Sequence, residues 1–297
     1  MRIDALIEEG RRAFESADLW FGHGSDNAFD EAAELVLFGA GRGHEEAPGV
    51  YGAEVDAATV RKIRELFARR INERVPAAYL TRRMWFAGLE FYVDERVLVP
   101  RSPIAELIES HFSPWIGTAP VGRVLDIGTG SGCIAIGCAV AFPDAVVDAA
   151  DISEAALDVA RINVARHRLA QRVQLYRADV YDGLPEGARY DLIVANPPYV
   201  SQAEVDALPA EYRHEPALGL AAGDDGLDIV RRILAGAGKR LTPEGLLVVE
   251  VGDTEEATVA AFPELPFTWL EFERGGGGVF LLNATDLRIA DPAGTGR

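Results

Sequence analysis

VLDIGTGSGC, at residues 124–133, is the stretch that decides the fold of this chain. A hydrophobic strand ends at Asp126, glycines occupy three alternate positions from Gly128 to Gly132, and a helix of small residues follows them. Glycine is needed at such a turn because the backbone has to bend sharply and to contact a ligand, where a Cβ atom would collide. The stretch predicts a nucleotide-type turn at the carboxyl end of a strand.

A GxGxG loop alone is a weak signal, and two details strengthen it, the first of which disfavours the dinucleotide fingerprint GxGxxG/A. That fingerprint requires Gly or Ala at the position of Cys133. Asp151 closes the next predicted strand, nineteen residues after Gly132, where its carboxylate can accept both ribose hydroxyls. Asp179 closes the third predicted strand, where its carboxylate or the backbone at Val180 can bind an adenine amino group. A lone aspartate after a strand is more often a cap or turn residue, but this order behind a glycine loop favours ligand binding.

Outward from the loop, short apolar runs alternate with amphipathic stretches from Arg123 onward. This alternation predicts a parallel sheet with helices on both faces. The segments TWLEFE at 268–273 and VFLLN at 279–283, joined through glycines at 275–278, predict a closing hairpin. The sequence therefore belongs to the α/β class.

The chain before this sheet has a different pattern. Apolar residues recur at helical spacing in three segments, 3–14, 29–40 and 56–71, and a glycine-rich loop at 39–52 separates the last two. MWFAGLEFYVDERVLV at 84–99 predicts a β-hairpin between the two parts of the chain. A small helical domain should therefore precede the sheet.

The tetrapeptide Asn196, Pro197, Pro198, Tyr199 follows the fourth predicted strand, at the same carboxyl edge as the glycine loop. Two consecutive prolines end the strand and hold the backbone rigid, which fixes the Asn196 side chain and the Pro197 carbonyl. A plain turn would not require this asparagine and tyrosine together with an upstream glycine loop. NPPY is the most specific signal in the chain.

These residue types suit methyl transfer to a planar NH2 group, whose nitrogen is a poor nucleophile because its lone pair is delocalised. If the Asn196 side-chain oxygen and the Pro197 carbonyl each accept one N–H, the nitrogen becomes more electron-rich and faces a sulfonium methyl. Tyr199 can stack on the flat group and exclude water. Orientation can supply ~7 to 11 kcal/mol of the barrier, so no strong general base is required.

Composition and charge limit the partners. With 297 residues, 48% hydrophobic and 26% charged, the chain should fold as one large and one smaller domain. The formal net charge of −18 disfavours direct nucleic acid binding and would attract a basic protein, although acidity also serves solubility alone. No apolar run reaches the ~18 residues of a membrane span and the start is polar, so we expect a cytoplasmic protein with no membrane partner.

Metal-binding patterns are not legible in the sequence. Cys133 and Cys138 lie five residues apart, which matches no zinc pattern, and the five histidines are scattered. We expect two buried, reduced thiols and no metal.

The chain resembles the ribosomal-protein and release-factor glutamine N5-methyltransferases over most of its length. The resemblance rests on RVPAAYLT at 74–81, FYVDERVLVPRSPIAELI at 91–108, VLDIGTGSGCIAI at 124–136 and NPPYV at 196–200. It implies a seven-stranded, Rossmann-like class I methyltransferase domain behind a small helical domain. The expected segments are a helical substrate-recognition domain at 1–82, a β-hairpin linker at 83–100, the methyltransferase domain at 101–285 and a flexible tail at 286–297.

The resemblance also implies roles for residues. Asn196, Pro197, Pro198 and Tyr199 would hold the acceptor glutamine, with Arg101 as a further substrate contact. The residues expected to bind S-adenosylmethionine are Asp126, Gly128, Thr129, Gly130, Ser131, Gly132, Asp151, Asp179, Val180 and Asn196.

The sequence also indicates the branch of the family. Release-factor enzymes typically carry PRPDTE where residues 100–105 read PRSPIA, and tend to have an aromatic residue in place of Val180. PRSPIAEL resembles the branch that methylates the third protein of the large ribosomal subunit. A basic ribosomal protein is therefore the expected partner.

Three other functions remain open at this stage. They are the same reaction on a release factor, amino-methylation of a nucleic acid base by an NPPY-type enzyme, and a non-catalytic ribosome-assembly factor. The basic run VRKIRELFARR at 60–70 is interpreted as a solvated helix face, which disfavours the nucleic acid alternative. We expect the N-terminal helices and the 84–99 hairpin to recognise the protein substrate.

Overall fold

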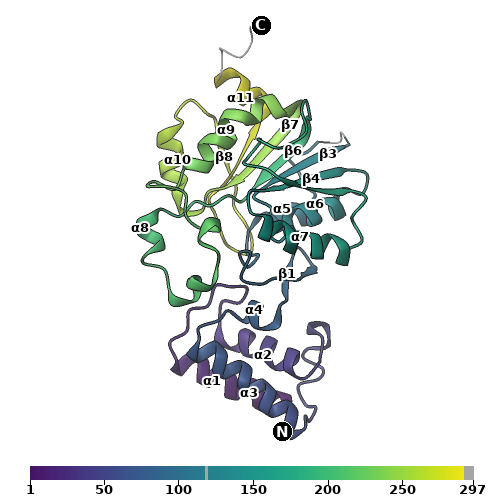
Figure 1. Ribbon diagram of the computed structural model, residues 1–297, viewed down its shortest axis with the longest axis vertical. Helices are drawn as coiled ribbons and strands as arrows, with labels where there is room; N and C mark the ends of the chain where they lie inside the picture. Colours follow the sequence, from purple (N-terminus) through teal and green to yellow (C-terminus); the bar gives the residue numbers. More distant parts are fainter. Residues whose placement is uncertain (118–119, 291–297) are drawn as a thin grey trace.

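A seven-stranded sheet forms the centre of the larger domain in the computed structural model, which describes residues 1–117 and 120–290 (Figure 1). The strand order is β5-β4-β3-β6-β7-β9-β8, and β9 alone runs antiparallel to the others. The strands are β3 (Arg123–Ile127), β4 (Val146–Asp151), β5 (Val173–Arg177), β6 (Tyr190–Ala195), β7 (Leu241–Glu250), β8 (Thr268–Trp269) and β9 (Val279–Asn283). The predicted parallel sheet and closing hairpin are confirmed.

Helices cover both faces of this sheet because successive side chains in each strand point to opposite faces. Val124 lies in the core formed with α5 (Ile104–Glu109) and α6 (Cys133–Ala141), whereas Leu125 lies in the core formed with α9 (Asp228–Arg240) and α11 (Ala284–Ala290). The remaining helices of this domain are α7 (Glu154–Arg166), α8 (Gln202–Val205), α10 (Glu255–Ala261) and the short 3-10 turns Ala210–His214, Ala217–Gly219 and Gly252–Thr254.

The N-terminal domain is helical, as predicted. It contains α1 (Ile3–Ser16), α2 (Ala28–Gly39), α3 (Ala57–Asn72), α4 (Ala77–Thr81) and a 3-10 turn at His44–Glu46. Asn27 and Asp56 cap α2 and α3 by accepting a backbone N–H three residues ahead. The core of this domain also includes Ala156 and Val159 of α7, so the two domains share apolar contacts.

The connecting hairpin is shorter than predicted. Its strands are β1 (Met84–Phe86) and β2 (Leu89–Phe91), and the prediction of strand up to Val99 is wrong. The Asp94 carboxylate accepts from the backbone N–H and the guanidinium of Arg96, which turns the chain away from a strand. The Val99 N–H then donates to Glu215, 3.0 Å away, instead of to a neighbouring strand.

The C-terminal end differs from the expected tail at 286–297. Helix α11 continues to Ala290 and buries Leu287 against α9, whereas the rest of the expected tail lies outside the described residues. Cys133 and Cys138 are buried free thiols, as predicted. Within residues 1–117 and 120–290, none of the helices has the length and apolar character needed to cross a membrane.

Candidate active site

A cavity of about 760 Å³ opens at the carboxyl edge of the sheet. The loops after β3, β4, β5 and β6 line one side of it, as expected for ligand sites in open α/β sheets. An added Cβ on Gly128 would lie 3.7 Å from the carbonyl oxygen of Asn196. The glycine loop and the NPPY segment are therefore neighbours on one cavity wall.

The glycine loop divides its residues between the cavity and the core. Gly128 and Gly130 line the cavity with φ of 74° and 54°, a backbone conformation that favours glycine. Thr129 and Ser131 also line it. Gly132 does not: its φ is 82° and an added Cβ would lie 3.3 Å from the Ala160 methyl carbon of α7, so this glycine serves helix packing.

Asp126 lies behind the loop and not on the cavity wall, in contrast to its predicted cofactor contact. The strand extends one residue beyond it, to Ile127. Its carboxylate is fully buried and accepts from the Thr129 hydroxyl at 2.6 Å and from the Ala135 N–H at 3.0 Å. Burial raises the pKa of Asp126 to about 7. Asp126 thus shapes the loop from the inside.

Asp151 is the last residue of β4, as predicted, and lines the cavity. One carboxylate oxygen accepts the Gly130 N–H and the other the Ser153 N–H, both at 2.9 Å. Burial raises the pKa of this carboxyl group. The side chain therefore stabilises the glycine loop and presents its remaining lone pairs to the cavity.

Asp179 and Val180 line the cavity, but β5 ends at Arg177, two residues before the predicted strand end. The Asp179 carboxylate pairs with Arg232 of α9 at 2.8 Å, and this hydrogen bond lowers its pKa. Val180 is buried with a φ of 59°, which is strained for a β-branched residue. The backbone at Val180 is thus held in an unusual conformation at the cavity wall.

The NPPY segment follows β6 directly, and all four of its residues line the cavity. Among the hydrogen bonds of the described residues, none involves the side-chain amide of the half-buried Asn196. The Tyr199 hydroxyl donates to Glu250, the last residue of β7, at 3.0 Å. The amide of Asn196 thus remains available to a ligand, whereas the tyrosine ring is fixed.

Comparison with known proteins identifies the family. A ribosomal protein uL3 glutamine methyltransferase of Xanthomonas campestris pv. campestris is 50% identical over 95% of this chain and 91% of its own length. The chain belongs to the ribosomal protein uL3 glutamine methyltransferase family. A second relative with that name, from Francisella tularensis subsp. tularensis, is 45% identical over 91% of this chain and 86% of its own length. The methyltransferase small domain family model matches residues 107–211, which include the glycine loop and NPPY.

Solved structures agree on the fold. The hMettl16 catalytic domain in complex with MAT2A 3'UTR hairpin 1 superposes with a TM-score of 0.52 at 15% identity, covering 94% of this chain and 90% of that one. At this identity the likeness concerns the fold alone. The uL3 glutamine methyltransferase family member thus has the predicted class I Rossmann-like methyltransferase fold.

Arg101 was predicted to contact the substrate of this uL3 glutamine methyltransferase family member. It lines the cavity, but its guanidinium already pairs with Glu215. Its guanidinium forms two hydrogen bonds with Glu215, at 2.6 and 2.9 Å, and lies over the ring of Tyr212 at 5.4 Å. Burial alone would raise the pKa of Glu215, but His23 and Arg101 lower it to about 2. Arg101 therefore orders the cavity mouth.

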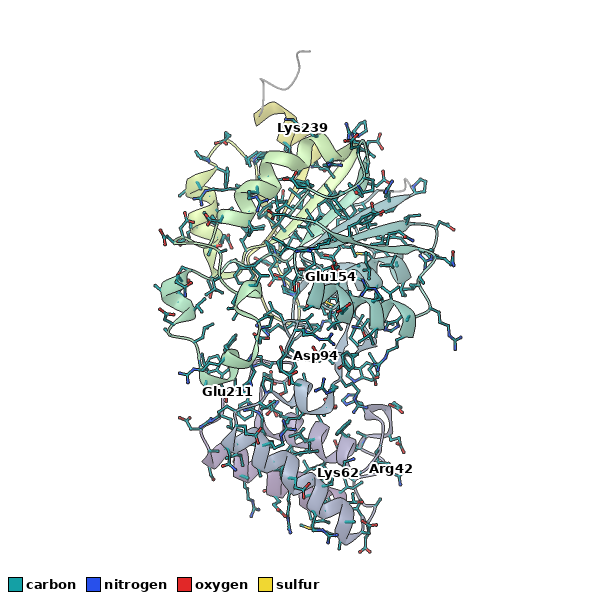
Figure 2. All side chains as sticks on the ribbon, in the orientation of Figure 1. Arg42, Lys62, Asp94, Glu154, Glu211 and Lys239 are labelled. Carbon is teal, nitrogen blue, oxygen red and sulfur yellow. The ribbon has the colours of Figure 1, made fainter. Side chains whose placement is uncertain are left out.

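The sequence did not predict the segment beside Arg101, which lines the cavity through Tyr212. Residues 211–215, EYRHE, carry two buried carboxylates, Glu211 and Glu215, and Figure 2 shows Glu211 where the segment meets the helical domain. Glu211 accepts from Arg70 of α3 at 3.1 Å and from the Trp20 N–H at 3.1 Å. The only signal in the sequence was this pair of glutamates at a four-residue spacing.

Arg70 also corrects the interpretation of residues 60–70 as a solvated face. Its side chain is 1% exposed and pairs with Glu31 of α2 as well as with Glu211. Arg61, Arg64 and Arg69 of the same helix are exposed. Arg70 therefore lies buried between the two domains and not on a solvated face.

Proposed function

We propose that this protein transfers a methyl group from S-adenosylmethionine to the side-chain amide nitrogen of a glutamine in ribosomal protein uL3. The observation that carries the proposal is the shared cavity wall, on which Gly128 lies beside Asn196. A donor seated on the glycine loop and an amide held by NPPY would be neighbours there. The uL3 glutamine methyltransferase names of the relatives support this substrate.

The donor end of the cavity fits S-adenosylmethionine. Gly128 and Gly130 leave room for close approach to the backbone, and Asp151 offers free carboxylate lone pairs to ribose hydroxyls. Asp179 and Val180 lie at the end of the neighbouring strand, where the adenine would bind. When bound, S-adenosylmethionine supplies an electrophilic methyl group on a positively charged sulfur.

The acceptor end fits a planar amide. The Asn196 side-chain oxygen and the Pro197 carbonyl would each accept one N–H of the glutamine amide, which orients its lone pair. Pro197 is buried and Pro198 keeps the turn rigid, so these acceptors do not have to reorganise during the reaction. The fixed ring of Tyr199 would exclude water from one face.

The charges around the cavity favour a protein over a nucleic acid. Three arginines line it, and each is paired with a carboxylate: Arg96 with Asp94, Arg101 with Glu215 and Arg232 with Asp179. In each pair the carboxylate offsets the guanidinium charge and occupies N–H donors that a phosphate would need. Together with the net charge of −18, this arrangement suits a basic protein.

One contact also favours the ribosomal-protein branch over the release-factor branch. The Ser102 hydroxyl, in the segment PRSP, donates to the buried carboxylate of Glu250. Proline, which the PRPDTE segment of release-factor enzymes places there, cannot form this hydrogen bond. Ser102, one of the residues that differ between the branches, thus lines the cavity.

Incubation of purified uL3 with the enzyme and labelled S-adenosylmethionine tests the proposal. Label should enter one glutamine, and uL3 from cells that lack the enzyme should be lighter by one methyl group. Asn196→Ala should retain most of its donor binding and lose turnover, whereas Asn283→Ala, at an exposed position on β9, should behave as the wild type. Label in ribosomal RNA or a release factor would reject the proposed substrate, and full rescue of ribosome assembly by Asn196→Ala would favour an assembly factor.

A further inference from the structure

Glu250 is a buried carboxylate with no assigned role in the proposed methyl transfer. It ends β7, is 5% exposed and lines the cavity. One of its oxygens accepts the Tyr199 hydroxyl at 3.0 Å and the other accepts the Ser102 hydroxyl. The carboxylate therefore joins NPPY to PRSP, two segments that line the same cavity.

The rest of the structure leaves the Tyr199 ring little freedom. An added Cβ on Gly252, whose φ is 50°, would lie 2.5 Å from a ring carbon of Tyr199. An added Cβ on Gly226, whose φ is 75°, would lie 2.3 Å from the carbonyl oxygen of Tyr199. The glycines admit the ring and the backbone of Tyr199, while Glu250 fixes the hydroxyl end.

Glu250 forms no ion pair among the residues that the structure describes. Arg101 is a nearby guanidinium, but it is bound by Glu215. Burial raises the pKa of Glu250, and only two neutral hydroxyls donate to it. Keeping a carboxylate in such a place is unfavourable for folding, because a hydrophobic residue of similar volume would pack there without desolvation.

We propose that Glu250 is a positioning residue for methyl transfer, which holds the Tyr199 ring against the acceptor amide and couples that ring to Ser102. This inference rests on the proposed function. In the transfer, the amide nitrogen bonds to the methyl carbon as the carbon–sulfur bond breaks, and the nitrogen then releases its proton to water. A fixed ring keeps the amide in line with that bond.

Kinetics of three variants test the inference. Glu250→Leu, which cannot accept the Tyr199 hydroxyl, and Tyr199→Phe should each lower kcat by roughly ten- to a hundredfold, with KM and Kd for S-adenosylmethionine unchanged. The double variant should lose no more than Glu250→Leu alone, because both single variants remove the hydrogen bond between Tyr199 and Glu250. Glu244→Gln, at an exposed position on the same strand, is the matched control and should keep wild-type kinetics.

The outcomes separate this inference from the proposed function. If the wild type methylates uL3 and Glu250→Leu retains its kcat, or if the losses in the double variant multiply, the positioning role is wrong and the function stands. If the wild type does not methylate uL3, the proposed function is wrong. In that case a double-mutant cycle on the free energy of unfolding measures the coupling between Tyr199 and Glu250. If the two residues are not coupled, the inference is wrong.

Discussion

Arg70 and Glu211 form a buried ion pair between the two domains, with the guanidinium Nη1 3.1 Å from the carboxylate Oε1. Each side chain is at most 2% exposed. Glu211 belongs to the segment between NPPY and α9, which lines the cavity through Tyr212 and Leu218. The helical domain therefore helps to shape the acceptor end of the active site.

Removal of the Arg70 charge should destabilise the protein strongly. Arg70→Met leaves Glu31 buried without its guanidinium partner and leaves Glu211 with only the longer contact to Arg74, at 3.5 Å, so we expect a loss of about 3–5 kcal/mol in the free energy of unfolding. Urea unfolding followed by circular dichroism measures it. The control is Arg64→Met on the same helix, which breaks an exposed pair with Glu9 and should leave the midpoint unchanged. Equal effects of both variants would contradict a special role for the buried pair.

Asp126 should make the protein less stable as the pH rises from about 4 to about 7. Its pKa is raised in the folded state to about 7, so the folded protein binds more protons than the unfolded chain in this range. The stabilisation is fully present below the unfolded pKa and is lost as the pH rises through the folded pKa. At about 1.4 kcal/mol per pKa unit, the loss amounts to a few kcal/mol at most.

Asp126→Asn tests this dependence because asparagine can still accept from Thr129 and Ala135. Other carboxyl groups also titrate in this range, so the quantity to compare is the difference between variant and wild type. The variant should gain stability relative to the wild type between pH 5 and pH 8, as measured by urea unfolding at each pH. A difference that stays constant with pH would contradict the raised pKa.

Gly252→Ala should displace the Tyr199 ring, because the added Cβ would lie 2.5 Å from a ring carbon. We expect methylation to fall by up to about 100-fold. Gly275→Ala is the control, since Gly275 also has a positive φ of 85° but no atom lies within 4 Å of an added Cβ. Both variants carry the backbone strain, and only the first moves the ring. Similar methylation rates for the two variants would refute the prediction.

The parts of this fold that depend on local sequence could be predicted. The strand, glycine turn and helix at 123–141 follow from hydrophobic pattern and backbone freedom, and so does the position of NPPY at the same sheet edge. The hairpin was overestimated because the β-branched residues after Phe91 suit a strand, whereas the Asp94 side chain forms a turn. The alternation of hydrophobic and polar residues does not show that the Asp94 side chain forms a turn in place of a strand.

The contacts that depend on tertiary structure could not be predicted. Glu211 and Glu215 look like ordinary surface residues, and their partners Arg70 and Arg101 lie more than a hundred residues away. Asp126 was predicted to contact the ligand because it borders the glycine loop, but its side chain points into the core. The direction of a side chain at a strand end is set by packing.

The structure also refines the expectation that the helical domain recognises the protein substrate. Deletion of residues 1–75 would remove Arg70 and leave Glu211 unpaired, so such a truncation would disturb folding and recognition together. Trp20 is a sharper probe. Its backbone is fixed, because its N–H donates to Glu211 and its carbonyl accepts from Arg70, whereas its side chain remains available at the cavity mouth.

Trp20→Ala should therefore weaken binding of uL3 without affecting the donor. Trp20 is 49% exposed and lines the same cavity as Leu218, which is 59% exposed, so together they offer an apolar surface at its mouth. We expect KM for uL3 to rise about tenfold or more, as for an aromatic contact at the centre of an interface, with KM for S-adenosylmethionine unchanged. Trp115→Ala, a similarly exposed tryptophan outside the cavity, is the control. An unchanged KM for uL3 in Trp20→Ala would exclude this tryptophan from recognition, because its fixed backbone leaves only the indole as the altered group.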